Sequence, residues 1–212
     1  MRQRNKPWAD DFIKKHHQLI ISDPITYKSK WQALFKNNNP IHIEIGTGKG
    51  QFIVGMAEMY PHINFIGIEL SKSVIVTAAQ KVLESKQENI LLLNVNAEQL
   101  LDYFSENEIA TIYLNFSDPW PKNRHEKRRL TYKNFLRFYE KIIQKNGKVI
   151  LKTDNRKLFE YSLVSFSQFP MKIEEVNLDL HAEEDIANVQ TEYEEKFAAK
   201  GQNIYRCIAS FK

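Results

Sequence analysis

The sequence predicts an α/β fold built on a mostly parallel sheet, and three observations predict it. Segments of strand character alternate five times with segments of helical periodicity along the 212 residues. The first strand segments are nearly continuous apolar runs, which are typical of parallel strands covered by helices on both faces. Gly-containing turns separate strands from helices, as at Gly46 after a strand and Asn146-Gly147 after a helix.

The strand segments share short length, apolar content and a polar or Gly end. The first alternates weakly and stops at Gly46, and the last two alternate polar and apolar residues. In chain order the predicted strands are 40–45, 64–69, 90–96, 111–116, 148–153, 172–180 and 203–211.

The helical segments share apolar residues three and four positions apart. The first ends before Asp23-Pro24, which breaks a helix. The predicted helices are 9–20, 51–60, 72–86, 98–104, 130–144 and 155–168. The sequence contains no repeat, low-complexity linker or evident domain boundary, so we predict a single domain over residues 1–212 with a basic N-terminal arm at about residues 1–30.

Charge is unevenly placed, although the net charge is only +4 from 30 Lys and Arg and 26 Asp and Glu. Residues 122–129 hold five cations and one Glu, whereas residues 173–195 hold nine acids and no Lys or Arg. This placement favours a polyanionic partner. Mutual neutralisation of the two segments within the fold is the alternative. The cations Arg2, Arg4 and Lys6 grip phosphates or form a solvated chain end, and the sequence leaves both open.

Several classes of protein are disfavoured by composition. No apolar run approaches the roughly 20 residues of a membrane helix, and no apolar segment of a secretory signal follows the basic N-terminus. Cys207 is the only cysteine, so no disulfide forms within the chain, and no Cys or His cluster predicts a metal site. We therefore expect a cytoplasmic protein with no metal and no membrane association. A monomer and a homodimer both remain open.

Polar groups stand at the ends of the first five predicted strands. They are Glu44, Glu69, Asn96, Asp118 and Asp154. Because ligands of open α/β sheets bind beyond the carboxyl ends of the strands, we expect these groups to line one crevice.

The turn Gly46-Thr47-Gly48-Lys49-Gly50 lets a ligand approach the backbone closely. Its third glycine comes one residue too early for a dinucleotide fingerprint, which argues against a bound pyrophosphate. Glu69, 19 residues after Gly50, suits hydrogen bonds from ribose hydroxyls, and Asn96 suits an adenine amino group. Nucleoside recognition without pyrophosphate indicates S-adenosylmethionine, with Gly46, Gly48 and Gly50 among its contacts. A structural turn beside solvated acids is the alternative.

The segment Asn115–Arg129 is the strongest candidate site. Asp118 directly follows a strand, and Pro119 and Pro121 fix φ on either side of Trp120. The cations that follow suit the phosphates of a nucleic acid, whereas Trp120 either stacks on a base or is buried under the loop. An ordinary turn-initiating Asp before Pro is the alternative for Asp118.

The chain resembles the bacterial tRNA (guanine-N7)-methyltransferases. The resemblance extends from the basic arm to the C-terminus and rests on Glu44–Gly50, Gly67–Glu69, Asn115–Arg129, Lys152–Asn155 and Thr191–Phe197. The segment Asn115–Arg129 is close to diagnostic, while the glycine turn is generic to methyltransferases. The resemblance implies a three-layer Rossmann-like methyltransferase sandwich with a seven-stranded sheet and an antiparallel last strand.

The resemblance also implies site roles. It implies S-adenosylmethionine contacts at Glu44, Glu69, Asn96 and Asp118, and a catalytic role for Asp118. It implies guanine-site roles for Lys122, Asp154, Thr191, Glu192, Tyr193 and Glu194. It implies RNA contacts from Arg124, His125, Glu126, Lys127, Arg128 and Arg129. The implied product is N7-methylguanosine in the variable loop of tRNA.

One position departs from the family pattern, and two other functions remain open. The family usually has Asp where this chain has Asn96, which keeps a carbonyl acceptor but loses the negative charge. A methyltransferase acting on DNA or a small molecule is one alternative, because Asp-Pro-Trp loosely resembles the Asp-Pro-Pro-Tyr of exocyclic-amine methyltransferases. A non-catalytic RNA-binding module on the same fold is the other. The sequence also leaves open whether Asp118 stabilises charge, orients the base or accepts a proton.

Overall fold

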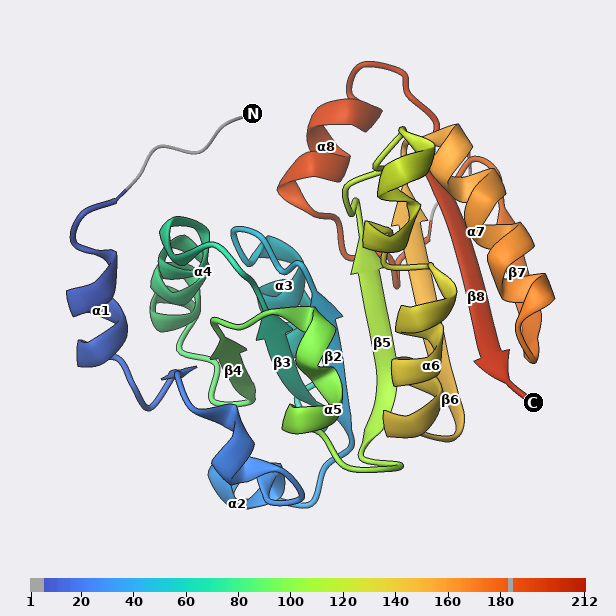
Figure 1. The fold of residues 1–212 in the computed structure, drawn as a ribbon. Helices are drawn as coiled ribbons and strands as arrows, with labels where there is room; N and C mark the ends of the chain where they lie inside the picture. Colours follow the sequence, from blue (N-terminus) through green and yellow to red (C-terminus); the bar gives the residue numbers. More distant parts are fainter. Residues whose placement is uncertain (1–5, 183–184) are drawn as a thin grey trace. The chain divides into compact units, whose positions relative to one another are not determined.

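The structure is a computed structural model that describes residues 6–182 and 185–212 (Figure 1). The chain divides into two compact units, Met1–Ser105 and Glu106–Lys212. The expectation of a single domain over residues 1–212 stays a prediction. Arg2 and Arg4 of the basic arm lie outside the described residues.

The first unit is built on four parallel strands. They are β1 (Ile20–Ile21), β2 (Ile41–Ile45), β3 (Asn64–Ile68) and β4 (Ile90–Leu93), in the order β1-β4-β3-β2. Ile43, Ile66 and Leu92 are fully buried. Continuous apolar strands of this kind need cover on both faces, and in Figure 1 α5 lies in front of these strands and α3 behind them.

The helices of the first unit pack on one another as well as on the strands. They are α1 (Ala9–Lys15), α2 (Trp31–Phe35), α3 (Gln51–Met59), α4 (Lys72–Ser85) and α5 (Leu100–Tyr103), with 3₁₀ turns η1 (Pro24–Tyr27) and η2 (Ala97–Gln99). The helix α1 packs on α4, and α3 packs on α4, β3 and β4. The arm cation Lys6 donates from its backbone N–H to Ser73 Oγ and from Nζ to Thr77 Oγ1, at 3.1 and 2.6 Å, which ties it to α4.

The predicted helix over 9–20 is wrong at its end. The helix stops at Lys15, and Ile20 and Ile21 form β1, which pairs with Leu92 and Leu93 of β4. Two adjacent β-branched side chains are both buried there, which a strand on the sheet edge achieves better than the end of a short helix. The described residues therefore contain one strand more than the seven expected.

The second unit carries the antiparallel part of the fold. Its strands are β5 (Ile109–Asn115), β6 (Ile143–Thr153), β7 (Met171–Asn177) and β8 (Tyr205–Phe211), in the order β5-β6-β8-β7. Strands β5 and β6 are parallel, while β8 runs antiparallel to β6 and β7. The expectation of an antiparallel last strand is confirmed.

Helices α6 (Lys133–Ile142) and α7 (Arg156–Gln168) cover one face of these strands (Figure 1), α8 (Glu192–Ala198) precedes β8, and a 3₁₀ segment, η3 (Asn123–Arg128), lies in the cationic loop. No helix of residues 6–182 and 185–212 combines the length and the apolar character needed to cross a membrane.

The predicted helix 130–144 and its Asn146-Gly147 stop are also wrong in position. The helix ends at Ile142, and β6 already begins at Ile143. Asn146, with φ of 68°, and Gly147 lie within β6, opposite a register shift in β5. A Cβ on Gly147 would lie 2.5 Å from Ile143 Cγ1 and 2.8 Å from Ala110 O, so the glycine is required by a bulge in the sheet.

Candidate functional site

The glycine turn connects β2 to α3, and its three glycines all have positive φ: 82° at Gly46, 59° at Gly48 and 87° at Gly50. A Cβ on Gly46 would meet no atom within 4 Å, and one on Gly48 only the Gly46 carbonyl oxygen at 3.9 Å. A Cβ on Gly50 would lie 2.9 Å from Ala78 of α4. Gly46 and Gly48 therefore leave the backbone open to a ligand, whereas Gly50 is required for the packing of α3 on α4.

Two acids hold this turn in place. Glu44 is buried at the end of β2, and its Oε2 accepts a 2.6 Å hydrogen bond from Thr47 Oγ1. Glu69 follows β3, and it accepts from the backbone N–H of Gly48 at 3.3 Å and of Ser71 at 2.8 Å. The structure thus brings Glu44, Glu69 and the glycine turn together, with the Glu69 side chain only half-buried.

Asn96 follows β4 and caps the turn η2. Its Oδ1 accepts from the Glu98 backbone N–H at 3.0 Å, and its Nδ2 donates to Glu98 Oε2 at 3.2 Å. An amide oxygen has two lone pairs, so this capping bond still leaves an acceptor position. The neighbouring Asn94 donates to the Glu69 and Leu70 carbonyl oxygens, which fixes the chain between β3 and β4.

In the second unit, Asp118 lies on a constrained turn after β5. Phe116 and Trp120, two residues before and after it, adopt positive φ of 49° and 42°. Such values are disfavoured for residues with a side chain, and they persist where surrounding contacts enforce them. The Phe116 N–H donates to the Lys152 carbonyl oxygen at 2.8 Å. Asp118 itself is exposed, so its carboxylate faces solvent from a restrained backbone.

Two predicted substrate residues, Tyr193 and Asp154, lie near this turn. Tyr193 is 44% exposed, and its ring centroid lies 5.2 Å from that of Phe116 and 4.2 Å from that of Phe197, on which it stacks. Burial, followed by the negative charges of Asp154 and Asp118, raises the pKa of Tyr193. Burial also raises the pKa of Asp154, which follows β6. Both carboxylates therefore lie near one aromatic side chain.

Thr191 and Glu194 begin helix α8 in a different role. Thr191 Oγ1 accepts from the Glu194 N–H at 2.9 Å, which is the N-cap bond of a helix start. The Glu194 carboxylate is fully buried, pairs with Lys152 Nζ at 2.6 Å, accepts from Asn188 Nδ2 at 2.7 Å and lies 3.1 Å from His181 Nε2. Glu194 therefore faces inward rather than toward a ligand.

Lys152 has a structural role near the candidate site to which the sequence analysis assigned no contact. It is 3% exposed, and its ammonium donates to Glu194, to Asn188 Oδ1 at 2.9 Å and to the Val189 carbonyl oxygen at 2.8 Å. These bonds attach the segment before α8 to β6. In the sequence, Lys152 directly follows the apolar run Val149-Ile150-Leu151. A lysine at such a position is expected to be buried and therefore to need a buried acidic partner.

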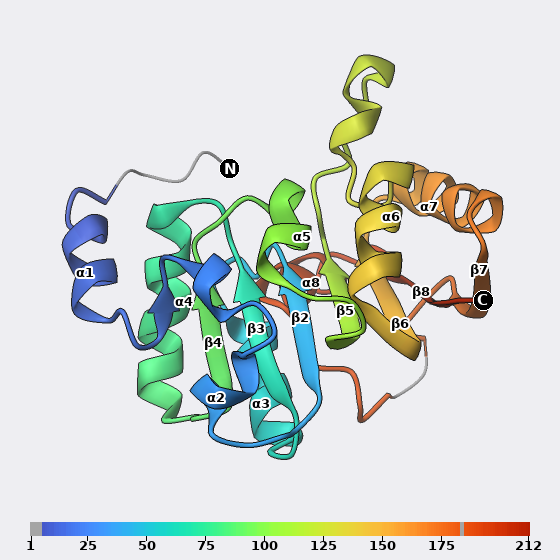
Figure 2. The same ribbon diagram turned by 60° about the horizontal axis from the view of Figure 1, so that its bottom comes forward.

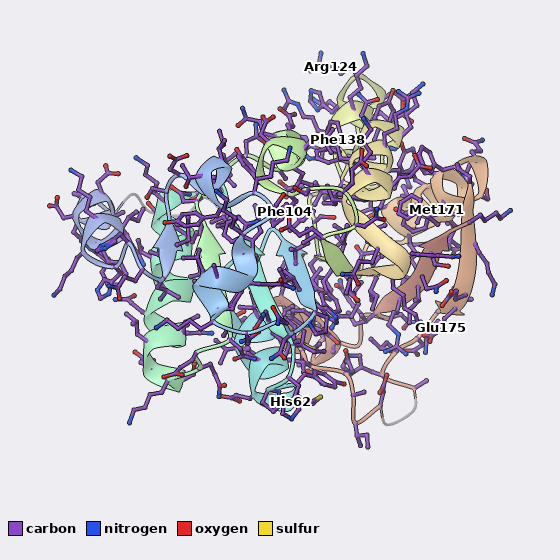
Figure 3. The ribbon with its side chains drawn as sticks, turned by 90° about the horizontal axis from the view of Figure 1, so that it is seen from below. His62, Phe104, Arg124, Phe138, Met171 and Glu175 are labelled. Atoms are coloured by element: carbon purple, nitrogen blue, oxygen red, sulfur yellow. The ribbon has the colours of Figure 1, made fainter. Side chains whose placement is uncertain are left out.

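The cationic loop is partly folded onto its own aromatic residues. The Arg128 guanidinium lies 4.8 Å from the Trp120 ring centroid, and the His125 ring contacts Trp120 edge-on. Lys122, Arg124, Lys127 and Arg128 are exposed. Figure 2 shows the loop extending beyond the end of α6, and Figure 3 shows Arg124 at its outer end. Exposed cations at the end of a loop suit phosphate contacts.

Two members of the predicted RNA-binding set are engaged within the protein. Arg129 donates to the Trp120 carbonyl oxygen and lies over the Tyr161 ring of α7. Glu126 accepts a hydrogen bond from the Tyr161 hydroxyl, which together with burial, the larger effect, raises the pKa of Tyr161 to about 12. Among the described residues no group of three or more His, Cys, Asp and Glu is arranged to hold a metal ion.

A family model described as a putative methyltransferase matches residues 38–207. Among solved structures, a 16S rRNA methyltransferase, KamB, superposes with a TM-score of 0.64 at 13% identity over 87% of this chain and 93% of its own. An antibiotic-related methyltransferase gives 0.62 at 16% identity over 87% and 94%. These likenesses confirm the expected Rossmann-like methyltransferase fold.

Similarity to curated proteins is much higher and spans the whole chain. A tRNA (guanine-N(7)-)-methyltransferase of Oceanobacillus iheyensis is 63% identical over 212 residues, covering 100% of both chains. The protein of the same name from Bacillus subtilis is 59% identical with the same coverage. With the family model over most of its length and relatives aligned from end to end, the chain belongs to the family of bacterial tRNA (guanine-N(7)-)-methyltransferases.

Proposed function

We propose that the protein transfers a methyl group from S-adenosylmethionine to N7 of a guanine in the variable loop of tRNA. The observation that carries the proposal is that the negative charges of Asp118 and Asp154 both act on the side chain of Tyr193, which is 44% exposed. Carboxylates accept hydrogen bonds from the N1–H and amino donors of guanine, and they stabilise the positive charge of the N7-methylated product. An aromatic side chain offers a face on which a purine ring stacks. Since the proposed substrate is tRNA, the protein is proposed to act in the bacterial cytoplasm.

The residues of the first unit fit S-adenosylmethionine. Gly46 and Gly48 leave open space where a ligand approaches the backbone. Glu69 has a half-buried carboxylate suited to ribose hydroxyls, and Asn96 keeps an acceptor for an adenine amino group. Glu44 supports the turn through Thr47. When bound, the sulfonium cofactor supplies the methyl group.

The chemistry asks for positioning rather than for a strong base. Guanine N7 has an in-plane lone pair and carries no proton at neutral pH, so the reaction needs alignment of N7 with the methyl carbon and sulfur. The product ring is cationic, and a fixed carboxylate such as Asp118 stabilises that charge as it develops. The restrained turn between Phe116 and Trp120 limits the positions that the Asp118 backbone can take.

Recognition of guanine follows from its Watson–Crick edge, where N1–H and the amino group are both donors. Asp154 and Glu192 are suitable acceptors, and the Tyr193 ring is a suitable stacking face. Lys122 suits a nearby phosphate or carbonyl oxygen. Thr191 and Glu194 contribute through the helix start and the buried ion pair that hold Tyr193 in position.

Binding of the RNA backbone is assigned to the exposed cations of the loop, Lys127 and Arg128 together with Arg124. Phosphate contacts position a nucleic acid without reading its sequence, and they make the affinity depend on salt. His125 lies against Trp120, where it supports the loop.

Methyl transfer from labelled S-adenosylmethionine to tRNA, duplex DNA and free nucleosides tests the proposal. We expect label in tRNA only, and a loss of 100-fold or more in kcat for Asp118→Ala with cofactor affinity changed much less. Label in DNA or nucleosides with none in tRNA would support the alternative substrates. Cofactor binding with no transfer to any of the three would support a binding module.

A further inference from the structure

The turn that carries Asp118 is held from two sides. On the side of Phe116, the backbone N–H is bonded to β6 and the ring packs on Tyr193. On the side of Trp120, which has φ of 42°, the carbonyl oxygen accepts hydrogen bonds from Arg129 Nη2 at 3.1 Å and from Arg129 Nε at 3.4 Å. The Arg129 guanidinium therefore hydrogen-bonds to the backbone two residues after Asp118, the proposed catalytic residue.

The Arg129 guanidinium is itself fixed against α7. It lies 4.2 Å from the ring centroid of Tyr161, a distance at which an arginine stacks on an aromatic face. The Tyr161 hydroxyl is bonded to Glu126, so the ring is held at both ends. Helix α7 begins at Arg156, just after Asp154. Arg129 and Tyr161 thus connect the turn that carries Asp118 to helix α7, which begins two residues after Asp154.

We propose that Arg129 is a positioning residue that fixes the Asp118 turn by bridging the Trp120 carbonyl oxygen and the Tyr161 ring, and that it is not an RNA phosphate ligand. The inference rests on the proposed function, since its catalytic effect is exerted through Asp118. It assigns different roles to two adjacent arginines that the sequence presents as one cationic run.

The neighbouring arginine provides the contrast. Arg128 is exposed, and its guanidinium stacks on the Trp120 ring without a hydrogen bond to the turn in the described part of the chain. Arg129 is half-buried and already donates two hydrogen bonds. Loss of Arg128 therefore removes a charge available to RNA, whereas Arg129 acts through geometry that a lysine does not reproduce, because lysine lacks the planar fork.

The decisive variant is Arg129→Lys, which keeps the charge. We expect kcat for tRNA methylation to fall at least tenfold, with KM for tRNA and the salt dependence of tRNA binding within twofold of wild type. Arg128→Ala should give the reverse: a higher KM, a salt slope reduced by about one and a kcat within twofold. Arg137→Lys, the same exchange at an exposed position of α6, should change neither parameter.

Tyr161 supplies an independent arm. Tyr161→Leu removes the stacking face and should lower kcat as Arg129→Lys does, and the double variant should lose less than the product of the two single effects. Tyr161→Phe keeps the ring and should retain most of the kcat. A normal kcat in Arg129→Lys, or a raised KM and a flattened salt slope in that variant, would overturn the proposal.

A readout without activity separates this inference from the proposed function. The chain has three tryptophans, so protein labelled with 5-fluorotryptophan gives few fluorine NMR signals, and Trp120→Phe identifies that of Trp120. We expect this signal to shift or broaden in Arg129→Lys at unchanged melting temperature, whether or not tRNA is the substrate. An unmoved Trp120 signal would contradict the bridging role. Failure of the wild-type protein to methylate tRNA would instead contradict the proposed function.

Discussion

Asn96 lacks the negative charge of the Asp that the family usually has at this position, and substitution measures the effect of that charge on cofactor binding. Its Oδ1 caps η2 and retains an acceptor position, so the adenine contact proposed for it does not need a carboxylate. We expect Asn96→Asp to change the affinity for S-adenosylmethionine by less than tenfold, measured by isothermal titration. A gain of tenfold or more, about 1.4 kcal/mol, would show that the amide impairs this site.

His42 on β2 contributes to the dependence of the protein's stability on pH in the acid range. Burial lowers the pKa of His42 from 6.5 to about 4. The unfolded chain therefore binds a proton between these values that the folded protein does not, and stability is lost as pH falls from 6.5 toward 4. Over that interval of 2.5 pH units, the loss is at most roughly 3 to 4 kcal/mol.

Denaturant unfolding of His42→Val between pH 7 and 4 checks this contribution. Valine suits a partly buried strand position, and we expect the variant to lose less stability than wild type over this range. Parallel pH curves for the two proteins would show that His42 does not carry the effect.

At the scale of elements, the buried pair of Lys152 and Glu194 connects α8 to β6. Both side chains are almost fully buried, and removal of one partner leaves an uncompensated charge in the interior. We expect Glu194→Gln and Lys152→Met each to lower the free energy of unfolding by roughly 3 kcal/mol. Equilibrium unfolding in a denaturant titration measures this loss in the free energy of unfolding.

The double variant and an exposed pair are the controls for that prediction. Lys152→Met/Glu194→Gln should lose less stability than the sum of the single variants, because neither charge is left alone. Glu160→Gln, which breaks the exposed pair with Arg156 on α7, should be indistinguishable from wild type. Wild-type stability in both single variants would refute a role for the buried pair in holding α8.

Elements with strong periodicity were predictable, and their irregular ends were not. Helix α7 starts one residue after its predicted start because Asn155 caps it through a bond to the Leu158 N–H. The start of β6 was missed because Asn-Gly commonly ends a helix. In this structure Asn146-Gly147 instead forms a bulge within β6, where Gly147 lies close to β5. β1 was missed because its two residues gain their strand partner only from β4, far along the chain.

At the scale of the whole molecule, the sequence predicted the class of fold and the family, while the segments assigned to the site stay predictions. It did not predict the direction in which individual site side chains face. The fully buried carboxylate of Glu194 and the guanidinium of Arg129 over Tyr161 depend on partners from distant segments, which spacing alone does not reveal. Gly50 likewise belongs to helix packing, although its neighbours Gly46 and Gly48 are open to a ligand.

The central claim is that the protein methylates guanine N7 of tRNA with the help of Asp118. The most direct measurement is nucleoside mass spectrometry of tRNA transcripts treated with the protein and S-adenosylmethionine, made either with guanosine or with 7-deazaguanosine, in which carbon replaces N7. We predict N7-methylguanosine at one position of the guanosine transcript, little or none with Asp118→Ala, and no methylation of the 7-deaza transcript. Equal methylation of both transcripts would contradict the account.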